Sequence, residues 1–500
     1  MRDGIKLVMM SAAVALPACG DDQVDSATGA GSTGTTAFIF NDTATTESPT
    51  TTNSTNASTS GVTEGSASAT EGTSAGSTTN ATSAGSTTDA TAGTTGQVSS
   101  TSETSGGSSS TGPVCVCNPG EVMGCDGNSL NVCADDCLGF GPQACPGQFD
   151  KCVDGMCVAP LCQPGTTTCE GVDQVKTCNQ NGDGFDPPTP CGQTQECSIN
   201  ACAELCLISE STPSSVGCSF FANKMDNFND TPDSVIVGNT HPSKTAKVQL
   251  YFVPNGQNTE QAQGAAVDVL PGKTYTFQLT NAAIDKASLL RTGGVYRVSS
   301  NIPIIAYQHS PLGAQATNDA SMLLPEFALK QNYVIASWKD WHAAYPSYFN
   351  VVATQDGTTV KWTPPQATSA GTGVPAVAAN QTGQVVMAKR FDTLQVRAPN
   401  GGDLSGTLVE ADKPVWVVGA AECINVPTNQ VTFCDHIEEQ MLPLDYWGKQ
   451  YVGAHSPKRG NEKHYWRIFA GENNVQVTTT PAQPGTPFMI NKAQFKELVV

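Results

Sequence analysis

The chain from Ser219 onward consists of short apolar runs that are separated by Gly, Pro and Asn. In one pair, the runs at 349–354 and 358–362 flank Asp356-Gly357. An Asp-Gly pair supplies the positive φ angles of a tight hairpin turn, so this pattern predicts two antiparallel strands joined by a hairpin. No long amphipathic helix pattern competes with the strand pattern.

Similar pairs of runs occur on both sides of this one. A matching pair at 466–470 and 475–477 follows 117 residues later, and a looser pair at 234–237 and 247–251 precedes it. Three starts at about 115-residue spacing predict a tandem all-β array, either propeller-like or a sandwich. The third copy stops at 495–500 in what should be a strand, without the partners of the earlier copies.

A second sequence pattern occurs twice in the segments between these pairs of apolar runs. Each copy has an Asp, a Leu-Pro pair and a Tyr-Val pair, with eight residues from Pro to Tyr; the first copy is Asp319, Leu324-Pro325 and Tyr333-Val334, and the second is Asp435, Leu442-Pro443 and Tyr451-Val452. A duplicated unit is typical of a scaffold that presents a binding surface. We interpret the pattern as the connector between successive β units.

Composition divides the chain into four regions. We expect a lipoprotein signal peptide at 1–19, a disordered Ser/Thr/Gly-rich tether at 20–113, disulfide-rich modules at 114–218 and the mainly β domain at 219–500, which is either incomplete at its C-terminus or ends in an abbreviated unit. The tether carries no Lys or Arg and too few apolar residues to offset chain entropy.

The N-terminus predicts export and lipidation. Arg2 and Lys6 precede an apolar run at 7–16, and the tetrad Leu16-Pro17-Ala18-Cys19 is typical of a lipobox, although Pro17 departs from the usual small residue. A plain secretory signal is the alternative. The apolar run is too short to span a bilayer, so we expect the acyl chains on Cys19 to be the only membrane attachment, to the outer membrane or the cell surface.

Sixteen of the 19 cysteines lie between Cys115 and Cys218. Twelve of them form two sets of six at an offset of about 45 residues: Cys117, Cys125, Cys133, Cys145, Cys152 and Cys157, then Cys162, Cys169, Cys178, Cys191, Cys197 and Cys202. Even numbers of cysteines in an exported chain predict disulfides. We expect two small cross-linked modules, whose connectivity the spacing does not reveal.

Charge and residue types exclude several partners. A formal net charge of −20 argues against nucleic acid, because phosphate binding draws on clustered Lys and Arg. Zinc is disfavoured in the cysteine-rich region, which contains no His and no Cys-x-x-Cys pair. We expect neither a metal nor a cofactor.

The β region resembles a known family. Several segments occur in the order of the IgGFc-binding protein N-terminal domain family: Pro303-Ile304-Ile305-Ala306-Tyr307, Thr317-Asn318-Asp319, Leu323-Leu324-Pro325, Val351-Val352-Ala353-Thr354, Lys413-Pro414-Val415, Cys434-Asp435-His436, Glu439-Gln440 and Leu442-Pro443. The resemblance covers about 235–500. It implies an extracellular interaction module, here on a bacterial lipoprotein, and does not imply immunoglobulin binding.

Candidate chemistry gathers around the second connector. Cys423 and Cys434 enclose a ten-residue loop, for which a disulfide is the simplest account. Asp435, His436 and nearby glutamates could bind metal or act as acid and base, but local hydrogen bonds that hold the loop explain them more simply. A Cys434-His436 nucleophile is disfavoured, because catalytic Cys and His are usually brought together by the fold.

Aromatic residues concentrate after the first connector. Trp338, Trp341 and Tyr345 could stack on sugars or anchor a protein partner, although aromatics at strand spacing are more often buried in a core. With Asp435 and His436 they form our candidate binding surface. We expect a non-enzymatic surface lipoprotein that binds an extracellular protein or glycan; the alternatives are an extracellular hydrolase acting on polymers and a structural protein without a ligand.

Overall fold

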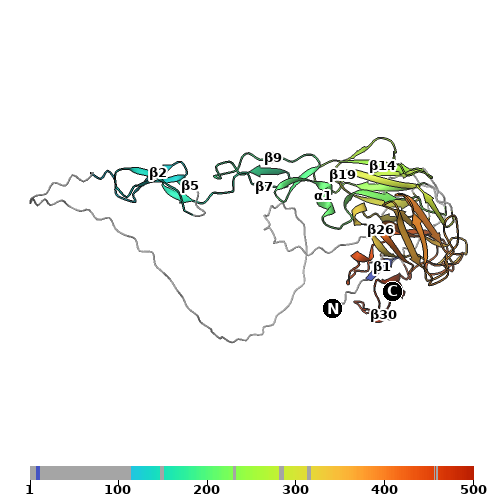
Figure 1. Ribbon diagram of the computed structural model, residues 1–500. Coiled ribbons are helices and arrows are strands. Elements are labelled where there is room, and N and C mark those ends of the chain that lie inside the picture. The colour runs from blue at the N-terminus through green and yellow to red at the C-terminus, as the bar shows by residue number, and fades with distance from the viewer. Residues whose placement is uncertain are drawn as a thin grey trace, which may run out of the picture. The chain divides into compact units, whose positions relative to one another are not determined.

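The computed structural model describes residues 7–11, 114–146, 151–228, 232–280, 286–311, 317–454, 457 and 460–500 (Figure 1). Cys19 and the expected tether lie outside the described residues. In the part that the structure describes, strands dominate, so the prediction of a mainly β fold is confirmed. No helix among these residues is long and apolar enough to cross a membrane.

The first cysteine-rich module contains two small antiparallel sheets. Its strands are β2 (Val122–Asp126), β3 (Ser129–Cys133), β4 (Phe140–Gln143), β5 (Lys151–Val153) and β6 (Met156–Val158). Its disulfides are Cys115–Cys137, Cys117–Cys133, Cys125–Cys152 and Cys145–Cys157. Cross-links replace the apolar core that so short a segment cannot build.

The second module repeats this arrangement. Its strands are β7 (Thr167–Glu170), β8 (Gln174–Thr177), β9 (Thr189–Pro190), β10 (Gln195–Ser198) and β11 (Ala201–Glu204). Its disulfides are Cys162–Cys178, Cys169–Cys197 and Cys191–Cys202. Within each of the two repeated sets of six cysteines, the first is joined to the third, the second to the fifth and the fourth to the sixth. The predicted disulfide repeat is therefore confirmed, and the Cys115–Cys137 bridge lies outside it.

The second module belongs to the same compact body as the β domain, and the boundary between the two bodies of the chain lies between Ala159 and Pro160. Helix α1 (Leu205–Glu210) follows β11 and is joined to β12 (Gly217–Ala222) by the Cys206–Cys218 disulfide. Two contacts add to this link: a hydrogen bond between His241 and Glu196 at 2.9 Å and an ion pair between Lys244 and Asp173 at 2.9 Å.

The β domain begins with an eight-stranded antiparallel sheet. Its strands are β12, β13 (Asp233–Gly238), β14 (Ala246–Val253), β15 (Gln261–Ala262), β16 (Val267–Val269), β17 (Thr274–Leu279), β19 (Val295–Ser310) and β20 (Asp319–Met322). The 16-residue strand β19 pairs with β12, β13, β14 and β20. We call β12–β17, β19 and β20 the first β unit.

A second eight-stranded sheet repeats this pairing. Its strands are β18 (Leu289–Thr292), β21 (Lys330–Val334), β22 (Ser347–Ala353), β23 (Thr358–Thr363), β24 (Gly383–Met387), β25 (Asp392–Arg397), β26 (Leu408–Ile424) and β27 (Asp435–Gln440). The 17-residue strand β26 takes the place of β19 and pairs with β21, β22, β23 and β27. We call β21–β27 the second β unit; only β18 is contributed by the preceding segment.

The predicted hairpins of these two units are wrong. Strands β22 and β23 do not pair with each other; both run antiparallel to β26 and pair with successive segments of it. The chain therefore continues in one direction through Asp356-Gly357, with Gly357 at a φ of 66°. Strands β13 and β14 are related to β19 in the same way. A partner strand that follows 42 to 75 residues later overrides the local turn preference, since tertiary context decides strand pairing.

The third β unit is shorter. It contains β28 (Tyr465–Ala470), β29 (Val475–Val477), β30 (Phe488–Ile490) and β31 (Phe495–Val499), in which β28 pairs with β31 and β29 with β30. The last strand therefore has a partner, contrary to the sequence expectation. The other edge of β28 pairs with β1 (Leu7–Ser11) from the N-terminal segment.

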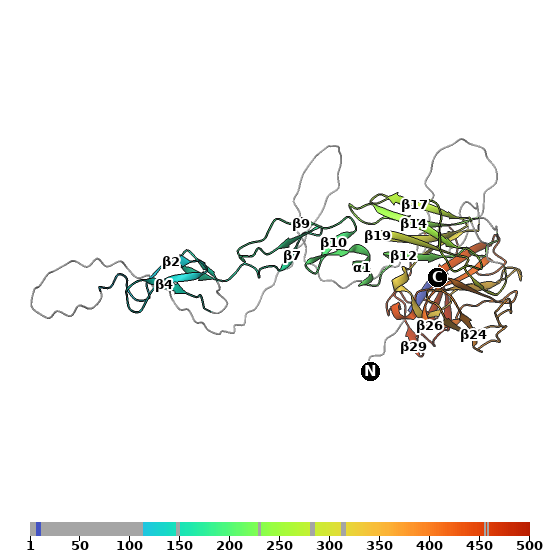
Figure 2. The same cartoon turned by 45° about the horizontal axis from the view of Figure 1, so that its top comes forward.

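The second sheet has both faces covered, and Figures 1 and 2 show β14 and β19 on one side of β26. Alternate residues of β26 enter different cores: Trp416 and Val418 pack with the first sheet, whereas Val415 and Val417 pack with a cluster that includes Phe469 of the third β unit. Successive side chains of a strand point to opposite faces, so a strand buried on both faces is apolar throughout.

Replacing Trp416 with Ala tests this arrangement. Its side chain is 0 % exposed, and loss of a buried Trp leaves a cavity, so we expect the free energy of unfolding to fall by about 3–5 kcal/mol. Urea denaturation under non-reducing conditions measures the change. Val386→Ala on β24, where the side chain is 55 % exposed, is the control and should stay within about 0.5 kcal/mol; equal losses in both variants would contradict the layering.

Candidate functional site

The two connectors meet through strands β20 and β27. Asp319 accepts hydrogen bonds from its neighbour Ala320, at 2.9 Å, and from the Glu438 backbone N–H, also at 2.9 Å. Asp435 likewise accepts from its neighbour His436 at 3.0 Å, and the Asn318 backbone donates to it from the other connector. Each copy of the duplicated Asp therefore binds its own strand and the other β unit. We call these contacts the connector clasp.

Side chains extend the connector clasp along both strands. The Ser321 hydroxyl donates to Glu439 at 3.1 Å and accepts from the Gln440 N–H at 2.6 Å. The Gln440 side chain in turn accepts from the Leu324 N–H at 2.8 Å. These bonds satisfy backbone groups that neighbouring strands leave free, which accounts for the polar residues at positions between two cores.

A buried group of ionisable side chains lies beside the clasp. The Gln308 amide donates to Glu438 at 3.2 Å, and His436 Nε2 lies 3.5 Å from the same carboxyl oxygen. Asp233 accepts from the Met225 N–H at 2.8 Å and from the Ser310 hydroxyl at 2.9 Å. Both His436 and Glu438 are only 1 % exposed.

Burial shifts the protonation of this group. It raises the pKa of Asp233 and Asp319 to about 7, of Glu438 to about 8 and of Asp435 to about 6, and it raises the pKa of Glu439 well above its usual range. Burial also lowers the pKa of His436. Water is excluded, so neutral forms are favoured. No set of three His, Cys, Asp or Glu side chains in the described ranges is arranged to hold a metal ion.

The predicted surface residues separate into three environments. Trp338 is buried at 4 % exposure, with the Arg467 guanidinium 3.5 Å from its ring centroid. Asp435 and His436 belong to the clasp and its buried group. Trp341 and Tyr345 are partly exposed, in the segment that follows β21. The structure therefore does not bring all five residues onto one surface; the expectation of a core location holds for Trp338, and His436 is also buried.

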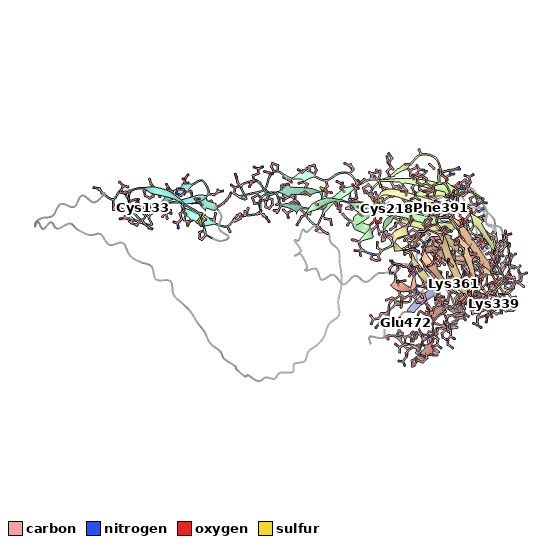
Figure 3. All side chains as sticks on the ribbon, in the orientation of Figure 1. Cys133, Cys218, Lys339, Lys361, Phe391 and Glu472 are labelled. Carbon is pink, nitrogen blue, oxygen red and sulfur yellow. A yellow bond between two sulfur atoms is a disulfide. The ribbon has the colours of Figure 1, made fainter. Side chains whose placement is uncertain are left out.

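Trp341 and Tyr345 lie beside the Cys423–Cys434 loop. The predicted disulfide between these cysteines is present and joins the end of β26 to the start of β27. The amide of Asn429 in the loop donates to the Trp341 carbonyl at 3.2 Å, and His342 is hydrogen-bonded to Asn425 at 2.5 Å. Lys339, labelled in Figure 3, lies over the Trp341 ring at 4.1 Å.

Two exposed aromatic residues that the sequence did not single out belong to the same region: one contacts Tyr345, and the other lies in the loop that is hydrogen-bonded to Trp341. Phe228, 45 % exposed, meets Tyr345 edge-on with ring centroids 5.3 Å apart, and Phe433, 63 % exposed, lies in the disulfide loop next to Cys434. We call Phe228, Trp341, Tyr345 and Phe433 the aromatic surface. The predicted Cys423–Cys434 disulfide could have drawn attention to Phe433, which lies next to Cys434. Nothing in the sequence links Phe228 to Tyr345, more than a hundred residues later.

A buried carboxylate holds this segment in shape. Asp340, 1 % exposed, accepts backbone hydrogen bonds from His342 at 2.9 Å, from Tyr345 at 2.9 Å and from Gly401 at 3.2 Å. A carboxylate that accepts several backbone N–H bonds fixes a loop that has no regular pairing of its own. The segment that carries Trp341 and Tyr345 is therefore held in one conformation, which reduces the entropy lost on binding.

Stability should fall as pH rises from 5 to 9. Asp233, Asp319 and Glu438 hold protons more tightly in the folded state, so their contribution is complete below their unfolded pKa of about 4 and is lost as pH rises through their folded values. His436 acts in the opposite direction, because its pKa is lowered, but the carboxyls outnumber it.

Urea denaturation at each pH measures this slope. Glu438→Gln keeps an oxygen that can accept from Gln308 and removes the ionisable group, so the slope above pH 6 should become shallower. Glu472→Gln, at an exposed position labelled in Figure 3, should leave the slope unchanged. A free energy of unfolding that rises with pH would contradict the burial of these carboxyls. So would an equal pH dependence in the unmodified protein, Glu438→Gln and Glu472→Gln.

Comparison with known proteins identifies one part of the chain. No curated protein and no solved structure is detectably similar to it. The family model described as IgGFc binding protein matches residues 319–500, from the first Asp of the connector clasp to the third β unit. The resemblance seen in the sequence motifs is thus confirmed for residues 319–500, which match the IgGFc binding protein family.

Proposed function

We propose that this protein is an exported, lipid-anchored receptor or adhesin whose aromatic surface binds an extracellular protein. The family match suggests an extracellular binding role, and the abundance of disulfides among the described residues agrees with an oxidising compartment. The aromatic surface is the observation that carries the proposal. Exposed aromatics with rigid support are typical anchors of protein interfaces.

The backbone at Phe433 supports a role for this residue in binding. Its φ is 66°, a conformation that costs a bulky L-residue roughly 1–2 kcal/mol, and its ring is 63 % exposed, so burial does not compensate the cost. Unusual backbone conformations that stability does not require concentrate at functional positions. The disulfide to Cys423 holds the adjacent residue in place.

We propose binding in preference to catalysis. The best acid–base candidate was the cluster of Asp435 and His436, but His436 is 1 % exposed and lies inside the buried group beside the connector clasp. A general acid or base must come within hydrogen-bonding distance of its substrate. The geometry of this cluster favours a structural role, which leaves the hydrolase alternative without its best residues.

We propose anchoring through acylated Cys19 in the outer membrane or at the cell surface, with 20–113 as the tether. Two or more acyl chains give stable attachment where one gives only marginal binding. A tether of this composition has a flexible-coil reach on the order of 50 Å, enough to carry the folded part away from the bilayer. No nucleic acid partner is proposed, given the net charge of −20.

The double variant Trp341→Ala/Phe433→Ala tests the aromatic surface. The labelled chain is applied to surface-protein extracts and to glycan arrays, and the bound ligand is then titrated. We expect the variant to bind the ligand at least about tenfold more weakly, because loss of an aromatic anchor costs more than about 1.4 kcal/mol. A ligand found only on the glycan array would overturn the proposal that the ligand is a protein, but not the proposal that it binds at the aromatic surface.

Tyr275→Ala is the matched control. Tyr275 is an aromatic residue of similar exposure, at 42 %, on β17 of the first sheet. Its replacement should leave ligand binding unchanged. Binding that survives the double variant, or that is lost equally in the control, would remove the aromatic surface as the contact site, and a chain that binds nothing on either support would favour the structural alternative.

Lipidation is tested by globomycin, which blocks the peptidase that processes lipoproteins. Cells that produce the chain should accumulate the unprocessed precursor in its presence, and Cys19→Ser should prevent acyl labelling while leaving the folded part intact. Immunoblots and labelling with an alkyne fatty acid measure both effects. Normal processing in the presence of globomycin would show instead a plain secretory signal.

A further inference from the structure

Strand β28 occupies the position that β13 and β22 hold in the first and second β units. Strand β13 has β17 on one edge and the long strand β19 on the other, and β22 has β25 and the long strand β26. In the third β unit, β31 takes the place of β17 and β25. The remaining edge of β28 is thus the place of a long strand.

The N-terminal strand β1 fills this place. It pairs antiparallel with β28, from Leu7 opposite Ala470 to Ser11 opposite Trp466. It carries no charged residue. The long strands are also without acidic or lysine and arginine side chains in the segments that pair with β22 and β13, at 415–421 and 305–309. All three occupants thus lack acidic, lysine and arginine side chains, although they have different sequences.

The backbone N–H and C=O groups of β28 point alternately to its two neighbouring strands. His464 and Val500 exchange backbone hydrogen bonds at 2.9 Å, and the Ala470 N–H donates to the Gln494 carbonyl at 3.2 Å, so the backbone groups of the even-numbered residues point to β31. In an antiparallel ladder the residues between them face the opposite edge. Arg467 and Phe469 therefore direct their N–H and C=O groups to β1. Both are buried, at 6 % and 1 % exposure, and unpaired backbone groups at such positions are costly.

We propose that this edge of β28 is a strand-acceptor site, which takes an extended, uncharged, apolar segment of another polypeptide antiparallel to β28. The inference rests on the export proposed above, because removal of the leader takes β1 away and leaves the edge of Arg467 and Phe469 without its partner. Addition of a strand to an exposed edge gives affinity through main-chain hydrogen bonds, and the absence of charge in the occupants sets the specificity.

A fluorescent peptide of residues 7–14 tests the site by anisotropy, with the full chain and the chain without residues 1–18 as receptors. The shortened chain should bind the peptide, and the full chain should bind it at least about tenfold more weakly because β1 competes from within. Hydrogen exchange at Arg467 and Phe469 should slow when the peptide binds the shortened chain. Equal binding by the two chains, or none by the shortened chain, would overturn the proposal.

Matched peptides test the geometry. The register places Val8 and Met10 opposite Phe469 and Arg467, so N-methylation of Val8 and Met10 should abolish binding, whereas N-methylation of Met9, whose N–H faces away from β28, should preserve much of it. Equal effects of the two modifications would exclude strand addition. In the full chain, Val8→Pro should weaken the internal competitor and increase peptide binding, which keeps the test decisive if the shortened chain does not fold.

These results are independent of the aromatic surface. The peptide is added as a purified compound, and its binding is read at β28, so neither export nor ligand capture enters the measurement. Trp341→Ala/Phe433→Ala should leave peptide binding unchanged. Loss of peptide binding in that variant would place the peptide on the aromatic surface and would overturn the assignment to β28.

Discussion

The β domain depends on hydrogen bonds that its two complete units exchange at β20 and β27. Each short strand lies on the edge of a long strand and brings an Asp whose carboxyl binds both its own backbone and that of the other unit. Asp319 and Asp435 each accept a hydrogen bond from their own strand and one from the other unit. The two copies of the sequence pattern therefore have the same physical role. Neither unit satisfies the polar groups of its connector alone, which couples the folding of the two units.

The same constraint accounts for the unusual protonation beside the clasp. Packing two sheets over β20 and β27 removes water from Asp233, Asp319 and Glu438, and a buried carboxyl is cheaper to keep protonated than to leave charged without a cation. Arg467 shows the contrasting solution at the other core. It is buried between Trp338 and Phe495 and forms an ion pair with Asp403 at 2.9 Å, so here a buried charge is paired with an opposite one.

Local sequence signals predicted the element types and the repeat, and they failed where the partner is distant. Alternation and the Asp319 and Asp435 pattern were sufficient for a duplicated β domain, and cysteine spacing was sufficient for two modules. Asp356-Gly357 has the chemistry of a hairpin turn, but β26 pairs with both flanking strands, and contacts across 45 to 74 residues carry no local signature. Phe228 reaches Tyr345 for the same reason, so the candidate site was only half predictable.

Duplication separates the parts of the domain that carry structure from the part that is free to carry recognition. The clasp Asp occurs in both units and bonds to the other unit each time, so a change in one copy disturbs contacts with the other. The Cys423–Cys434 loop occurs in the second unit alone, and its Phe433 ring projects to solvent from a strained backbone. Since the disulfide fixes both ends of this loop, its sequence can vary without cost to the clasp beneath it. Recognition by this domain is therefore expected where the repeat is broken, on a support that the repeat makes rigid.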